Sequence, residues 1–161
     1  MKGKKTNLGA SACAIARSLN LIGDWWSLLI IRDALAGARR FGEFQTKLGL
    51  AKNILSARLR KLTEAGILAT APAADGSAYR EYRLTEKGEQ LYLVLAALWQ
   101  WGEKYAFAPG EQELLMVDNK TLRGMAPLEL RTLDGRRVGP RDYTRKRAGN
   151  AADQGHRARQ T

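Results

Sequence analysis

Apolar residues recur at helical spacing in four successive segments near the start of the chain. This pattern predicts helices over residues 12–20, 25–36, 41–48 and 52–65. Ser11 and Asp24 carry side-chain oxygens that can accept hydrogen bonds from backbone N–H groups, so we expect them to cap the first two helices. Gly37, Gly49 and Gly66 follow the second, third and fourth predicted helices, at the position where glycine commonly ends a helix.

The fourth predicted helix is amphipathic. Leu55, Leu59 and Leu62 recur at helical spacing and form one apolar stripe, which we expect to face the core. The opposite face is polar and mixes small, hydrogen-bonding and cationic residues, namely Lys52, Asn53, Ser56, Ala57 and Arg60. Because small side chains permit close approach to another surface, this face is a candidate binding surface.

After this helix the apolar pattern changes from helical spacing to alternation. Residues 67–71 and 79–84 predict two strands, and Asp75 with Gly76 favours a turn between them, so we expect a β-hairpin. Thr85 can cap a further helix, which we expect to run to about residue 107.

That last helix is apolar on more than the single stripe that a surface helix needs. Either it lies wholly inside the monomer, or a second copy of the chain covers it. A domain of this size has few helices with which to surround it, and obligate interfaces resemble a core cut in half. We therefore expect a homodimer interface that includes Leu91, Leu95, Leu98 and Trp99.

The composition changes beyond residue 107. Residues 114–117 and 127–133 predict short strands, whereas the chain beyond residue 140 is rich in Arg, Gly, Ala and Gln and is expected to be disordered. The predicted organisation is an N-terminal arm (1–10), a main domain (11–107), a small β appendage (108–139) and a basic, disordered tail (140–161).

Helices followed by a hairpin and a final helix, with a glycine-bounded turn before the fourth helix, are the order of a winged helix-turn-helix. The predicted fold class is therefore mainly α with a small β wing. In this fold the fourth helix would enter the major groove of DNA, its polar residues facing the bases and its cations contacting bases or phosphates. The residues expected to face the bases are Asn53, Ser56 and Ala57. The cations expected to contact bases or phosphates are Lys52, Arg58 and Arg60. Phosphate contacts that set the register would come from Arg39, Arg40, Arg80 and Arg83.

The charge balance agrees with a polyanionic partner. The formal net charge is +11 at pH 7 and the isoelectric point is about 10.2. Much of this excess lies in residues 136–159, where a solvated, disordered end is an alternative explanation. The prediction of DNA binding therefore depends on the main domain.

Cysteine and histidine are too scarce for several kinds of chemistry. Cys13 is the only cysteine and His156 the only histidine, which excludes an internal disulfide and a His/Cys metal site. The sequence has no glycine-rich phosphate loop, so we expect no cofactor, no metal and no enzymatic activity. No apolar run reaches the length of about 18–20 residues that a membrane span needs, and the start lacks a signal peptide, so we expect a cytoplasmic protein without a membrane partner.

The chain resembles the HxlR family, the MarR-like winged helix-turn-helix regulators of prokaryotes. The resemblance covers residues 11–105 and rests on the tryptophan-rich last helix, on YREYRLTEKG and on the run CAIARSLNLIGDWWSLLIIRDALAGARRFGEFQTKLGLAKNILSARLRKLTEAGIL. It implies a homodimer, paired through its first and last helices, that binds a pseudo-palindromic promoter operator, and we expect a repressor. Two places depart from the common pattern: Trp25 replaces a basic residue, and Ala51 with Lys52 replaces a Ser-Pro opening of the fourth helix.

Cys13 occupies the position of a cysteine that senses oxidants, quinones or aldehydes in some members of this family. The alternative is that Cys13 is a small apolar residue packed near the dimer interface. A small-molecule effector is a second candidate input, because Trp25, Trp26, Trp99 and Trp101 could line a pocket. Tryptophans also fill cores and interfaces, so we assign no ligand from sequence.

Two interpretations of the basic charge remain. The leading one is a sequence-specific dimeric regulator of transcription that binds double-stranded DNA. The alternative is an architectural or RNA-binding protein that uses charge without reading bases. Directional hydrogen bonding by Asn53, Ser56 and Arg60 favours the first.

Overall fold

The computed structural model describes residues 8–112 and 114–146. The chain divides into two compact units, residues 1–116 and 117–161. The sequence places its boundary after residue 107, whereas segment 108–116 belongs to the first unit.

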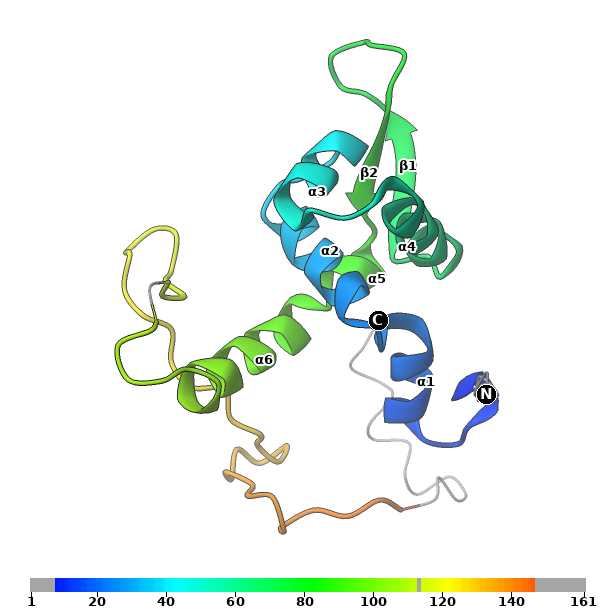
Figure 1. The fold of residues 1–161 in the computed structure, drawn as a ribbon. Helices are drawn as coiled ribbons and strands as arrows, with labels where there is room; N and C mark the ends of the chain where they lie inside the picture. The colour runs from blue at the N-terminus through cyan, green and yellow to red at the C-terminus, as the bar shows by residue number, and fades with distance from the viewer. Residues whose placement is uncertain (1–7, 113, 147–161) are drawn as a thin grey trace. The chain divides into compact units, whose positions relative to one another are not determined.

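The first unit is built from helices and one hairpin, after a 3-10 turn η1 (Leu8–Ala10) (Figure 1). Its further elements are α1 (Ala14–Ile22), α2 (Trp25–Leu35), α3 (Phe41–Leu48), α4 (Lys52–Glu64), β1 (Leu68–Pro72), β2 (Arg80–Leu84), α5 (Glu86–Glu89) and α6 (Tyr92–Tyr105). The predicted fold class, mainly α with a small β wing, is confirmed.

The core lies where α2, α3 and α4 meet the hairpin. The predicted leucine stripe of α4 is entirely enclosed, with Leu55, Leu59 and Leu62 each 0% exposed. Large apolar side chains from the rest of the first unit complete this core, among them Ile30, Ile31, Phe44, Ile67 and Leu68. Because burial of each such side chain is worth about 1.5–3 kcal/mol, the stripe holds α4 in one orientation on the body.

Asp24 caps α2 as predicted, whereas the predicted cap of α1 is wrong. Oδ1 of Asp24 accepts a hydrogen bond from the N–H of Ser27 at 2.9 Å, and Oδ2 accepts one from the Ser27 hydroxyl at 2.7 Å. Helix α1 starts at Ala14, two residues later than expected, and its N-cap is Cys13. Ser11 instead closes a turn ahead of the helix, where its Oγ accepts from the N–H of Cys13 at 3.1 Å.

The turn between α3 and α4 follows the sequence closely. Helix α3 spans the predicted residues, and Gly49 ends it at φ 63°, in the left-handed region that favours glycine. At the start of α3, Oε2 of Glu43 accepts hydrogen bonds from the N–H groups of Arg39 at 2.6 Å and Arg40 at 2.9 Å. Contacts within a few residues therefore stabilise both ends of the helix that precedes α4.

The wing is an antiparallel pair in which Leu68 lies opposite Leu84 and Pro72 opposite Arg80. Each strand starts one residue later than predicted, and Gly76 occupies the predicted turn at φ 73°. The carbonyl oxygen of Arg39 accepts a hydrogen bond from the N–H of Tyr82 at 2.7 Å, which ties the wing to the segment before α3.

The single long helix predicted after Thr85 is interrupted. Gln90 and Leu91 separate α5 from α6. Thr85 caps α5, since its Oγ1 accepts from the N–H of Gly88 at 3.2 Å. Gly88 lies directly against the backbone of the wing, where a Cβ would come within 2.2 Å of the carbonyl oxygen of Ile67. This contact fixes α5 to the wing, and α6 begins separately.

The second unit has no buried residue among those described, 117–146. Its extended segments meet only in two isolated antiparallel bridges, Val117 with Gly124 and Arg131 with Arg137. The strands predicted over 114–117 and 127–133 are therefore not formed, because no local core aligns them into a sheet. Of the tail predicted over 140–161, residues 147–161 lie outside the described part of the chain.

Candidate nucleic-acid interface

Helix α4 presents the polar face that the sequence predicts. The half-buried Ala57 lies among four exposed residues of this face, Lys52, Asn53, Ser56 and Arg60. The helix starts at Lys52, and its N-cap, Ala51, offers no side-chain hydrogen bond. The first N–H groups therefore have no side-chain acceptor, which leaves them suited to an anionic oxygen from outside.

Arg58 is turned away from this face. Its Nε lies 3.1 Å from Oδ1 of Asp24, the cap of α2, in an ion pair that lacks hydrogen-bond geometry. Lys61 donates to Oδ2 of the same carboxylate at 3.1 Å. The Arg58 side chain, predicted to contact DNA, connects α4 to α2 in this structure.

The charge of Asp24 is maintained by these contacts. Burial by itself would raise the pKa of this carboxyl group, but hydrogen bonds from Ser27 and Lys61 and the charge of Arg58 outweigh that effect. The pKa of Asp24 is consequently lower than its ordinary value. An ionised carboxylate at this point anchors α4 by two cations.

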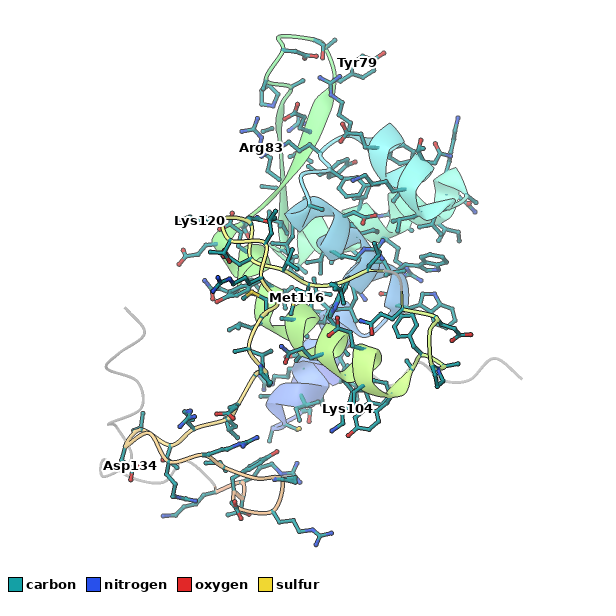
Figure 2. The ribbon with its side chains drawn as sticks, turned by 90° about the vertical axis from the view of Figure 1, so that its left-hand side faces the viewer. Tyr79, Arg83, Lys104, Met116, Lys120 and Asp134 are labelled. Carbon is teal, nitrogen blue, oxygen red and sulfur yellow. The ribbon has the colours of Figure 1, made fainter. Side chains whose placement is uncertain are left out.

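Two of the four arginines predicted to bind phosphate already have acidic partners in the wing. Arg40 pairs with Asp75 beside the turn, and its Nε lies 3.9 Å from Oε1 of Glu81. Arg83 donates to Oε2 of Glu81 at 3.0 Å. Figure 2 shows Arg83 along the wing and Tyr79 near its tip.

Glu81 is the buried member of this group. The hydrogen bond from Arg83 lowers its pKa most, and it prevails over desolvation with the help of the N–H of Ala74 and the charge of Arg40. The hydrogen bond from Arg40 likewise lowers the pKa of Asp75 far below its ordinary value. Two cations and two anions therefore offset one another at this side of the wing.

Arg39 and Arg80 remain the more accessible cations. Both are exposed, and neither has an acidic partner among residues 8–112 and 114–146. Nη2 of Arg80 donates to Oγ1 of Thr70 across the hairpin at 2.8 Å, which extends the guanidinium along the wing. These two arginines fit the predicted phosphate contacts best.

Helix α6 has no buried residue. Large apolar side chains recur on it at spacings of four, three and four residues, and they are exposed by 41%, 48%, 61% and 62% at Val94, Leu98, Trp101 and Tyr105. We call these four residues the α6 stripe. Helix α1 adds two more exposed apolar residues one turn apart, Ile15 and Leu19.

The four predicted interface residues divide between two environments. Leu98 belongs to the α6 stripe. Leu91 and Leu95 are only partly exposed and pack against the core of their own chain, because they lie at the end of α6 that adjoins the body. Trp99 is also half-buried, and its Nε1 donates to Oε1 of Glu103 at 2.6 Å.

The four tryptophans do not share one pocket. Trp25 is exposed and meets Trp26 edge to face, with ring centroids 6.3 Å apart. Trp26 packs against the core, whereas Trp101 lies in the α6 stripe. Trp99 lines a cavity beside α6.

Residues 21–109 match the family model described as HxlR-like helix-turn-helix. They include α2, α3, α4, the wing, α5 and α6. The chain belongs to the HxlR-like helix-turn-helix family. The resemblance predicted from sequence is confirmed.

Relatives of this HxlR-family chain are described as regulators and not as enzymes, in agreement with the prediction. An uncharacterized HTH-type transcriptional regulator of Mycobacterium tuberculosis, Rv3095, is 42% identical over 96 residues, or 60% of this chain. The match spans 61% of the length of that relative.

Two solved structures have folds similar to that of this HxlR-family chain. PA1607, a candidate transcription factor, has a TM-score of 0.84 and 47% identity, covering 88% of this chain and 99% of its own. The redox regulator HypR in its oxidized form has a TM-score of 0.54 and 27% identity, covering 60% of this chain and 100% of its own.

Cys13 lies half-buried at the N-cap of α1. Nε of Arg17 donates to the carbonyl oxygen of Ser11 at 2.5 Å, so a guanidinium lies at the same end of α1 as the thiol. Across the described residues, no helix is long and apolar enough to cross a membrane. The same residues contain no group of three or more His, Cys, Asp or Glu side chains that could hold a metal.

Sequence reasoning missed two acidic residues of this interface. Asp24 is predicted as a cap but not as the anchor of α4, because its partner Lys61 lies 37 residues away. Glu81 escapes because nothing in an alternating strand shows which charge becomes buried. The one signal in the sequence is that Glu81 is an acidic residue between two basic ones, Arg80 and Arg83.

Proposed function

We propose that this HxlR-family protein is a sequence-specific DNA-binding regulator of transcription that acts as a homodimer on a pseudo-palindromic operator. The observation that carries the proposal is the exposed polar face of α4. This face combines directional hydrogen-bonding groups with cations, while its leucine stripe is completely enclosed. A helix held in this way can enter a major groove without losing its place on the body.

Asn53, Ser56 and Arg60 would read base edges, and Ala57 would allow close approach of the helix. Lys52 and the uncapped first turn of α4 would bind phosphate. Arg39 and Arg80 would bind the flanking backbone and set the register. Arg40 and Arg83 would shape the wing through their acidic partners, and Arg58 would fix the orientation of α4.

The α6 stripe supports the homodimer. Its four large side chains recur along one side of α6, and α1 exposes two further apolar residues, Ile15 and Leu19. Exposed apolar side chains that gather in this way mark interaction surfaces. The spacing of the stripe is that of a helix-to-helix seam. A twofold pair would present two copies of α4 to half-sites about one helical turn of DNA apart. A dimer bound across a promoter would exclude polymerase, so we expect repression.

A binding selection with fragments of the source genome, followed by gel-shift titration of the selected fragment, tests this proposal. A specific reader prefers its site over random DNA by about a thousandfold or more. Asn53→Ala and Ser56→Ala should each reduce this preference. Ile54→Ala, which removes as many heavy atoms as Asn53→Ala at the neighbouring apolar position, is the matched control and should not. Equal affinity for all fragments would instead establish a non-specific architectural or RNA-binding protein.

Thiol sensing at Cys13 is a separable part of the proposal. It is supported by the half-buried position of Cys13 at the start of α1 and by the likeness to a redox regulator. With one cysteine per chain, the thiol can form an adduct or a disulfide between subunits. Cys13→Ser should leave DNA affinity unchanged and abolish its loss under diamide or a quinone. Unchanged sensitivity in this variant would assign Cys13 a structural role.

A further inference from the structure

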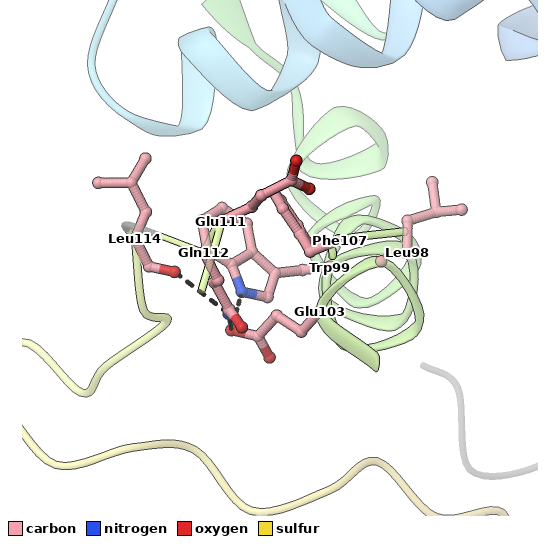
Figure 3. A pocket seen from close by; sticks show the side chains of 8 residues that line it. Leu98, Trp99, Glu103, Phe107, Glu111, Gln112 and Leu114 are labelled. Carbon is pink, nitrogen blue, oxygen red and sulfur yellow. Dashed lines mark hydrogen bonds between the residues drawn. The ribbon is translucent and has the colours of Figure 1, made fainter. Parts of the chain in front are cut away.

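A cavity of about 380 Å³ lies between the carboxyl-terminal half of α6 and the chain that follows it (Figure 3). This volume falls within the range of about 300–1,000 Å³ that is usual for small-molecule sites. The cavity belongs wholly to the first unit, and nothing in the HxlR-family assignment accounts for it.

The walls of the cavity are mostly apolar. Leu98, Trp99, Phe107 and Leu114 supply them, so two aromatic rings border the space. Gly102 keeps the α6 side open, since a Cβ at this position would meet nothing within 4 Å. An occupant therefore needs an apolar body, and the two rings favour one that can stack on them.

The polar groups of the cavity are acidic or neutral. Oε1 of Glu103 accepts hydrogen bonds from Nε1 of Trp99 at 2.6 Å and from Nε2 of Gln112 at 2.8 Å. Within the described residues, Oε2 of Glu103 has no hydrogen-bond partner. These contacts orient Glu103 and leave one of its oxygens available.

A second carboxylate, Glu111, lines the same cavity, where its Oε2 accepts from the N–H of Ala108 at 2.7 Å. No lysine or arginine is among the lining residues. Neither Glu103 nor Glu111 forms an ion pair with another described residue. In a protein of net charge +11, this cavity is therefore a local site of negative charge.

We infer that this cavity binds an organic cation with an aromatic or aliphatic body, such as an arylalkyl ammonium compound. The ammonium group would donate to the available oxygen of Glu103 and lie near the faces of Trp99 and Phe107, which attract cations. Anions are disfavoured by the two carboxylates, and a bare metal ion by the apolar walls. Binding itself does not require DNA, and only a regulatory role would rest on the proposed function.

Calorimetric titration of the full chain, without DNA, tests the inference with three probes of equal shape. These probes are 3-phenylpropylammonium, 3-phenylpropanol and 3-phenylpropanoate. We expect the ammonium compound to bind about tenfold or more tightly than the alcohol, because a charge-assisted hydrogen bond adds to the shared apolar contact. The carboxylate should bind most weakly. Equal affinities for the three probes would overturn the inference, and so would no binding, which would mean that the cavity is closed in solution.

Variants separate the roles of charge and shape. Glu103→Gln should remove most of the preference for the ammonium compound while leaving the affinity for the alcohol unchanged. Glu86→Gln, the same change at an exposed carboxylate of α5, is the matched control. Gly102→Leu should exclude all three probes by filling the cavity. An unchanged preference in Glu103→Gln would refute the site even if the chain still binds DNA, and ligand binding without DNA binding would refute only the proposed function.

Discussion

Helices α4 and α6 differ in what the monomer leaves uncovered. Helix α4 buries three leucines completely in the core and exposes a polar face, whereas α6 has no buried residue and exposes a stripe of large apolar side chains. The apolar side of α4 is covered within one chain, and its polar side is free to meet a partner of opposite charge. The apolar side of α6 is left uncovered, and exposure of such a line of apolar side chains to water is unfavourable. In our proposal the two helices therefore have different partners, DNA for α4 and a second subunit for α6.

The sharpest contrast is in stability. Leu59→Ala in the enclosed stripe of α4 should lower the free energy of unfolding by about 2–5 kcal/mol, because it leaves a cavity in the core. Ile54→Ala, on an exposed part of the same helix, should cost less than about 1 kcal/mol. Urea denaturation followed by circular dichroism measures both. Equal losses would show that α4 is not held by its leucine stripe.

The α6 stripe should govern association instead. Leu98→Glu places one charge per subunit in the proposed interface, and we expect the dissociation constant of the dimer to rise about a hundredfold or more. Tyr92→Glu is the control, because Tyr92 lies nine residues, about two and a half turns, from Trp101 and so on the other side of α6. Sedimentation equilibrium measures the constants. If the wild-type chain stays monomeric at all concentrations, the proposal that the α6 stripe forms a dimer interface is wrong.

Two arginines of α4 allow the DNA-facing side to be tested more finely. Arg60, whose side chain is 74% exposed, should contribute about 1–3 kcal/mol to specific binding, so Arg60→Ala should relax base preference at one operator position. Arg58→Ala should weaken the attachment of α4 to α2 and leave the order of preferred sites unchanged. Competition titrations with singly substituted operators distinguish these outcomes. A changed order of preferred sites in Arg58→Ala would show that Arg58 contacts the bases.

The smallest expected effect concerns the anchor of α4. Since the pKa of Asp24 is lowered in the fold from an unfolded value of 3.8, its stabilisation is present above that pH and is lost as the pH falls through the lower, folded value. Asp24→Asn keeps a good N-cap but removes the charge, and it should cost about 1 kcal/mol or less near neutral pH. Denaturation curves at several pH values should show the two proteins converging in acid. A constant difference down to acid pH would mean that the charge of Asp24 contributes nothing.

Local patterns predicted the elements whose determinants are close in sequence. The leucine spacing of α4, the Asp24 cap and the Gly49 ending depend on residues within one or two turns, and each was predicted correctly. The interruption before α6 was not, because Gly88 contacts the backbone of Ile67, which directly precedes β1 and is distant in sequence. The predicted appendage strands failed for a related reason, since pairing of extended segments needs a core that this unit does not build.

For the candidate site, residue types indicated the partner, but not which side chains would reach it. Periodicity along α4 was enough to separate an apolar side from a polar one, because both sides recur within a single helix. The tertiary structure decided that Arg58 pairs with Asp24 and that Arg40 and Arg83 pair with acidic residues of the wing. It also decided that Leu91 and Leu95 pack against the core while Leu98 is exposed. The Arg58–Asp24 and Arg40–Asp75 pairs join segments remote in sequence, and their distances exist only once the chain has folded. Arg83 and Glu81 are only two residues apart, but the burial of Glu81 likewise depends on the tertiary structure.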